Sequence, residues 1–98
     1  MPAAPLLSPD EVEAGLRDLP GWQLREGRLV KQFRCADFMD ALAFVQRVAA
    51  PAEEQNHHPD VMIRWRDVTL SLWTHAAGGI TRRDLRLAGS IEEVAQGR

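Results

Sequence analysis

The sequence DVMIRWRDVTLSLWTH, at residues 60–75, decides the fold. Large apolar side chains occupy every second position in its two halves: Val61, Ile63 and Trp65, then Val68, Leu70 and Leu72. Successive side chains of a β-strand point to opposite faces, so this period of two predicts two strands, at residues 60–65 and 67–75. We expect them to pair as a hairpin that turns near Arg66 and Asp67. His75 should then point away from the apolar side of its strand.

A second hairpin is predicted closer to the N-terminus. Two short strand-like runs, residues 22–25 and 28–33, are separated by Glu26 and Gly27. Glycine adopts the positive φ that a tight hairpin turn requires, so this spacing favours two paired strands.

A first helix is predicted before this hairpin. Ser8 is a favourable N-cap residue, Pro9 suits the first helical position, and Glu11 follows three residues after the cap. Val12, Leu16 and Leu19 would form its apolar side, and Pro20-Gly21 should end it.

Two longer helices complete the pattern. Asp37 is expected to cap a helix that reaches about Gln55, because apolar residues recur in it every three or four positions. Thr81 is expected to cap the last helix, with Asp84 as its partner in a capping box. The predicted order is α-β-β-α-β-β-α. We therefore expect an α+β fold in which three helices pack on one face of a four-stranded antiparallel sheet.

The last helix carries an unusually wide apolar surface. Its apolar residues form two stripes: Leu87, Ile91 and Val94, then Leu85, Ala88 and Ala95. One sheet can cover only one stripe, and small monomers rarely expose large apolar patches. The sequence therefore predicts a homo-oligomer, with a tetramer favoured over a dimer.

Length and composition indicate one globular domain, residues 1–98, with a flexible arm at residues 1–7. The net charge is -2, which gives no electrostatic reason to expect nucleic acid or an anionic membrane as a partner. Cys35 is the single cysteine, so neither an internal disulfide nor a cysteine zinc site is expected. No apolar run approaches the ~18 residues of a membrane span, and the N-terminus does not resemble a signal peptide. We expect a cytoplasmic protein.

The three histidines of the chain fall in two short segments, at His57-His58 and at His75. The adjacent pair could stabilise the end of the long helix through its dipole, ligate a metal together with His75, or transfer protons. The metal interpretation is the weakest, because consecutive residues project differently and the spacing matches no standard zinc motif. For Asp84 helix capping is the simpler role, and Trp22, Trp65 and Trp73 are expected in the core.

The pattern Glu53-x-x-x-His57-His58-Pro59, continued by Trp65, His75 and Asp84 at fixed spacing, resembles the signature of pterin-4a-carbinolamine dehydratases. The resemblance extends over residues 7–96, including Gly21-Trp22 and Arg83-Asp84-Leu85. It implies dehydration of 4a-hydroxytetrahydropterin to quinonoid dihydropterin, which recycles tetrahydrobiopterin. It also implies that subunits pair into dimers and tetramers, and that neither a metal nor an organic cofactor is used.

The resemblance also implies roles for individual residues. His57, His58 and His75 match the catalytic and substrate-binding histidines, with His57 and His75 favoured as the proton-transfer groups. Asn56 and Thr74 match pterin-contacting positions. Three further residues would support the site: Glu53, Trp65 and Asp84.

The chain also departs from the family pattern. Where members often read Ser-Thr-His-Glu-Cys, residues 73–77 read Trp-Thr-His-Ala-Ala, so a polar and an acidic side chain are missing beside the site. A partner-binding or assembly module on the same fold is the alternative function. The intact set of histidines favours the enzyme, since a scaffold has no need of all three.

Overall fold

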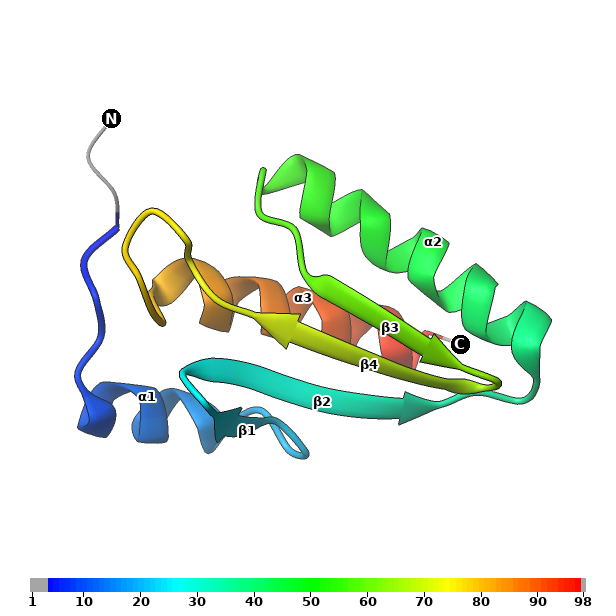
Figure 1. Cartoon of the computed structure of the whole chain (residues 1–98), viewed down its shortest axis with the longest axis horizontal. Coiled ribbons are helices and arrows are strands. Elements are labelled where there is room, and N and C mark those ends of the chain that lie inside the picture. The colour runs from blue at the N-terminus through cyan, green and yellow to red at the C-terminus, as the bar shows by residue number, and fades with distance from the viewer. Residues whose placement is uncertain (1–3, 98) are drawn as a thin grey trace.

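The computed structural model describes residues 4–97. Its elements are α1 (Pro9–Leu16), β1 (Gln23–Arg25), β2 (Arg28–Arg34), α2 (Phe38–Glu54), β3 (Asp60–Arg64), β4 (Asp67–Leu72) and α3 (Arg82–Gln96). The strands form one antiparallel sheet in the order β1-β2-β4-β3. Figure 1 shows α3 behind the sheet, and α2 packs beside α3. The predicted α+β fold and its element order are confirmed.

The alternation along β4 explains why the helices cover only one face of the sheet. Val68, Leu70 and Leu72 are almost fully buried, whereas Thr69 and Ser71 between them remain half-buried. The paired strand β2 continues the buried face with Leu29 and Phe33. Residues buried on this face form one hydrophobic core with the inward sides of α2 and α3.

The start of α1 follows the prediction, but its end does not. The hydroxyl of Ser8 accepts from the backbone N–H of Glu11, and the Glu11 carboxylate accepts from the backbone N–H of Ser8. Hydrogen bonds from the Ser8 backbone and side chain lower the pKa of the Glu11 carboxyl. The helix ends at Leu16 rather than at Pro20-Gly21. Leu19 is buried in the turn that follows the helix, where its carbonyl accepts from the backbone N–H of Trp22. Its apolar side chain therefore did not indicate a further helical turn.

The apolar residues of α3 pack against other elements of the same chain. The expectation that a second subunit must cover one stripe of this helix is therefore wrong. Leu87, Ala88 and Ile91 are fully buried, although they belong to two different stripes. Leu85 packs against α1 at Gly15, where a Cβ atom would lie 2.5 Å from the Leu85 Cδ1. The sheet, α2 and α1 together therefore cover both stripes.

The predicted flexible arm is only partly described, because residues 1–3 lie outside the described part of the chain. Leu7 is attached to the fold: its backbone N–H donates to the carbonyl of Ile80 at 2.9 Å, and its side chain packs against the core. Among residues 4–97, no helix is long and apolar enough to cross a membrane.

Candidate active site

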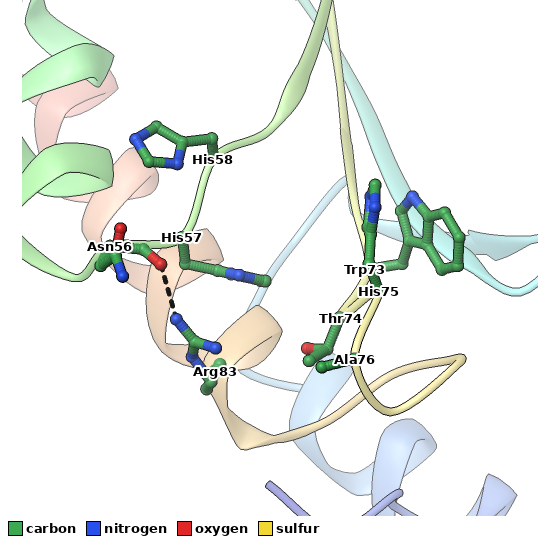
Figure 2. A pocket seen from close by; sticks show the side chains of 8 residues that line it. All are labelled: Asn56, His57, His58, Trp73, Thr74, His75, Ala76 and Arg83. Carbon is green, nitrogen blue, oxygen red and sulfur yellow. Dashed lines mark hydrogen bonds between the residues drawn. The ribbon is translucent and has the colours of Figure 1, made fainter. Parts of the chain in front are cut away.

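A pocket of about 260 Å³ opens where the end of α2, the segment after β4 and the first turn of α3 meet. Figure 2 shows the eight residues that line it: Asn56, His57, His58, Trp73, Thr74, His75, Ala76 and Arg83. Histidines distant in sequence are thus brought to one cavity. Its volume approaches that of pockets that bind small organic ligands.

The way α2 ends places the adjacent histidines. Asn56 has a positive φ of 48°, a left-handed conformation that asparagine tolerates better than most residues. Its N–H donates to the carbonyl of Glu53, and the N–H of His57 donates to the carbonyl of Ala52. These two bonds form a Schellman motif, which reverses the chain and sends His57 toward α3.

His57 is fixed by a buried carboxylate. Its Nε2 lies 2.6 Å from Oδ1 of Asp84, and only 7% of His57 is exposed. An ionised carboxylate can only accept, so this contact places a proton on Nε2 and leaves Nδ1 as the ring nitrogen available to a ligand. No other hydrogen bond involves this ring within residues 4–97.

The other oxygen of Asp84 belongs to a buried polar network. Its Oδ2 accepts from the backbone N–H of Thr81 at 2.9 Å and from the hydroxyl of Thr74 at 2.8 Å. The hydroxyls of Thr74 and Thr81 lie 2.7 Å apart. Asp84 therefore caps α3, as predicted, and holds His57 with the same carboxylate. The capping interpretation is confirmed, and the same carboxylate contacts a histidine of the pocket, while its role in a reaction remains a prediction.

His58 has a different environment. Its Nε2 contacts Oε2 of Glu53, one helical turn back, and both side chains are largely exposed. In Figure 2 the ring of His57 points toward Thr74, whereas that of His58 points to the other side of the chain. The adjacent histidines therefore project differently, as expected of consecutive residues.

In the segment after β4, successive side chains point alternately to the buried side and to the opposite side of the chain. Regular pairing of β4 ends at Leu72, earlier than predicted, but Thr74 continues as a single bridge to Gly79. Thr74 is buried toward Asp84. Trp73 and His75 lie on the opposite side, with ring centroids 4.0 Å apart and an angle of 32° between the ring planes. His75 thus points away from the apolar side, as the alternation predicted.

Arg83 lines the pocket, although no role was predicted for it. Its Nη2 donates to the carbonyls of Asn56 at 2.6 Å and Gln55 at 3.3 Å. A cation is favourable at the C-terminus of a helix, where carbonyls have no partner within the helix. Arg83 therefore supports the turn that carries His57. Spacing could not reveal this contact, because Arg83 belongs to a helix much later in the chain.

Most of the expected site residues meet at this pocket. Five of them line it: Asn56, His57, His58, Thr74 and His75. Glu53 and Asp84 contact two of these histidines from outside the lining. Trp65 is not brought to the pocket or the core. It lies at the turn between β3 and β4, 63% exposed, where Arg66 stacks on its ring.

The side chains around the pocket do not form a metal-binding group. Within the described residues, no set of three or more His, Cys, Asp or Glu side chains is arranged to hold an ion. Asp84 and Glu53 each contact one histidine separately. The arrangement can instead donate and accept protons at a small ligand, since imidazole does both near neutral pH.

Comparison with known proteins gives the family. The family model described as Pterin 4 alpha carbinolamine dehydratase matches residues 5–94. The chain belongs to this family. The family is described as a dehydratase family, and a dehydratase is a hydro-lyase.

Two relatives that carry pterin-4-alpha-carbinolamine dehydratase as a provisional name illustrate the similarity. The protein of Mycolicibacterium smegmatis is 48% identical over 89 residues, which covers 91% of this chain and 95% of the relative. The protein of Roseiflexus castenholzii is 50% identical over 91 residues, which covers 93% of this chain and 98% of the relative. This chain therefore spans nearly the full length of these dehydratase relatives.

Solved structures show the same fold. A transcriptional coactivator/pterin dehydratase from Brucella melitensis has a TM-score of 0.86 and 31% identity, and the match covers 91% of this chain and 97% of that one. A pterin dehydratase-like protein, described as a RuBisCO assembly factor in the alpha-carboxysome, has a TM-score of 0.60 and 23% identity. That match covers 76% of this chain and 86% of the other, and it shows the fold alone.

Proposed function

We propose that this chain dehydrates a 4a-hydroxytetrahydropterin to the quinonoid dihydropterin and water, a step of tetrahydrobiopterin recycling. In this reaction the C4a–O bond breaks and the N5 lone pair forms the C4a=N5 bond. The leaving hydroxide takes one proton and becomes water, while a ring nitrogen loses another. An enzyme for this step therefore needs one group that donates a proton and one that accepts a proton.

One observation carries the proposal: three histidines line a single pocket, and a buried carboxylate holds one of them. A structural histidine pair at a helix end would have no need of a third histidine from the segment after β4. A metal site would need ligands that converge on one point, and these rings point in different directions.

His57 is suited to act as the base. Asp84 holds Nε2 and thereby leaves Nδ1 free to accept the ring proton. A carboxylate in this position also stabilises the imidazolium that forms when the ring accepts a proton. His57 lies deep in the pocket, where water competes least for the proton.

His75 is suited to act as the acid, and His58 to position the substrate. His75 is exposed at the pocket mouth, from which a protonated ring could reach the leaving hydroxyl and be reprotonated by solvent. His58 and Asn56 lie on the α2 side of the pocket, where their polar atoms can contact the edge of a flat heterocycle. Thr74 also lines the pocket, and its hydroxyl is engaged by Asp84 and Thr81.

The test is a direct assay with 4a-hydroxytetrahydropterin generated in place by a pterin-dependent hydroxylase. We expect the protein to speed formation of quinonoid dihydropterin above the rate measured without it. A rate equal to that background would contradict the proposal and favour the alternative, a partner-binding or assembly module. Cytoplasmic location remains a prediction of the sequence.

A further inference from the structure

Each histidine of the pocket has a different partner. A buried carboxylate, Asp84, contacts His57, and an exposed carboxylate, Glu53, contacts His58. The backbone carbonyl of His75 accepts from the N–H of Gly78, but its imidazole makes no hydrogen bond among residues 4–97. The neighbouring Ala76 offers the ring neither a hydroxyl nor a carboxylate. An exposed ring without a polar partner would be free to leave the orientation that proton transfer requires.

We propose that Trp73 is the positioning residue of His75, which rests on the function proposed above. The two residues stand two positions apart in an extended segment, so their side chains share one side. Their ring centroids lie 4.0 Å apart and the planes are tilted by 32°, a close contact between the two rings. Stacking on a large rigid ring restricts the imidazole without neutralising it or competing for its nitrogens.

The indole is itself held from the neighbouring strand. Leu29 of β2 pairs with Leu72 of β4. Because the strands are antiparallel, Arg28, the residue before Leu29, lies beside Trp73, the residue after Leu72. The Arg28 guanidinium carbon lies 5.2 Å from the centroid of the Trp73 ring, within the range of a cation–π contact. Arg28 also forms an ion pair with Asp60 at 3.5 Å. A continuous series of contacts therefore runs from β3 through Arg28 and Trp73 to His75.

The orientation of the indole supports this role over that of a simple pocket wall. Its Nε1 is buried and has no hydrogen-bond partner among the described residues. In Figure 2 this nitrogen lies on the side of the indole that faces the His75 ring. Since the two rings are in close contact, each side chain limits the movement of the other.

The first experiment reads the stacking without any activity. Proton NMR of the two histidine rings would be compared in the unmodified protein, Trp73→Phe and Trp73→Ala. An indole above a ring shifts its proton signals, so Trp73→Ala should move the His75 signals while those of His57 stay in place. Unchanged His75 signals in Trp73→Ala would overturn the proposal, whether or not the protein proves to be a dehydratase.

The second experiment is a kinetic double-mutant cycle. Trp73→Ala should lower kcat about tenfold with little change in KM, and Trp73→Phe should restore most of kcat because it keeps a stacking ring. In a His75→Ala background, Trp73→Ala should have no further effect on kcat. Leu24→Ala, an exposed apolar truncation on β1, is the control and should leave both constants unchanged.

The outcomes separate this proposal from the proposed function. A loss confined to KM, or equal losses with and without the His75 side chain, would show that Trp73 is only a wall and would overturn the positioning role. An inactive unmodified protein would contradict the dehydratase, while the NMR comparison would still decide whether Trp73 holds His75.

Discussion

The carboxylate of Asp84 holds His57 and caps α3 at the same time. Oδ1 lies 2.6 Å from Nε2 of His57, and Oδ2 accepts from the backbone N–H of Thr81 at 2.9 Å. The rigid first turn of a helix thus fixes the position of a side chain in the pocket. Asp84 is fully buried, and its Oδ2 also accepts a hydrogen bond from the hydroxyl of Thr74.

Replacing Asp84 with Asn should impair the reaction more than the fold. The amide oxygen can still accept from Thr81, but its NH₂ group would donate to Nε2 and shift the ring proton to Nδ1, the wrong tautomer for a base. We expect kcat to fall by roughly tenfold to a hundredfold, a share of the 10²–10⁴-fold that acid–base catalysis usually contributes. Steady-state dehydration assays measure this.

The matched control for this change is Asp37→Asn. Asp37 also caps a helix, accepting from the N–H of Asp40 at 2.8 Å, but it lies at the start of α2 and does not line the pocket. Asp37→Asn should leave kcat unchanged. If Asp37→Asn and Asp84→Asn lowered kcat equally, the loss would come from helix capping and not from the contact with His57.

Replacing Thr74 with Val should destabilise the protein. The change removes the hydroxyl that joins Asp84 to Thr81 and leaves a buried carboxylate oxygen with one donor fewer. We expect the free energy of unfolding to fall by about 1–3 kcal/mol, measured by urea denaturation. Thr74→Ser keeps the hydroxyl and should be affected much less. A Val variant as stable as the unmodified protein would contradict the network described here.

The fold was predictable because its signals are local. Alternation set the faces of β4, and the Ser8 and Thr81 caps set where α1 and α3 begin. The errors arose where tertiary contacts decide. Leu19 is apolar because it is buried in a turn after α1, and no spacing rule separates this from another helical turn.

Most residues of the candidate pocket were predictable from the sequence, but their contacts were not. The fixed spacing pointed to the histidines, but it could not show that Asp84 contacts His57 while Glu53 contacts His58. Trp65 was expected to support the site, yet it stands at a hairpin tip, since a tryptophan in a strand pattern need not be buried. Trp73, in the segment after β4, lines the pocket instead, and Arg28 of β2 lies over its ring.

The dehydratase should need no metal. Dialysis against a strong chelator should leave both the dehydration rate and the melting temperature unchanged, because the histidines pair with carboxylates and an indole. A loss of either property that zinc restores would instead support a metal site formed by the histidines.

The chain is expected to form a tetramer or a dimer through α2 rather than α3. Three large apolar residues are exposed on α2: Phe38, Met39 and Leu42. An apolar groove follows between α2 and β3, formed in part by Val45, Ala49 and Val61. A second copy would cover this surface, so Leu42→Asp should lower the sedimentation coefficient while the far-UV circular dichroism is kept.

Gln96→Asp provides the control for this prediction, since it adds the same charge at an exposed polar position on α3, away from the apolar face of α2. It should leave the assembly intact. A stable 11.0 kDa monomer of the unmodified protein at micromolar concentration would contradict the expected association.

We predict that His57 and His75 transfer the protons of a pterin dehydration. The most direct test compares the unmodified protein with His57→Ala, His75→Ala and the double variant, using 4a-hydroxytetrahydropterin generated by a hydroxylase. We predict that each single variant slows dehydration by about two orders of magnitude or more, and that the double variant approaches the rate without protein. All should keep the circular dichroism of the unmodified protein. Full activity in the double variant would contradict the claim.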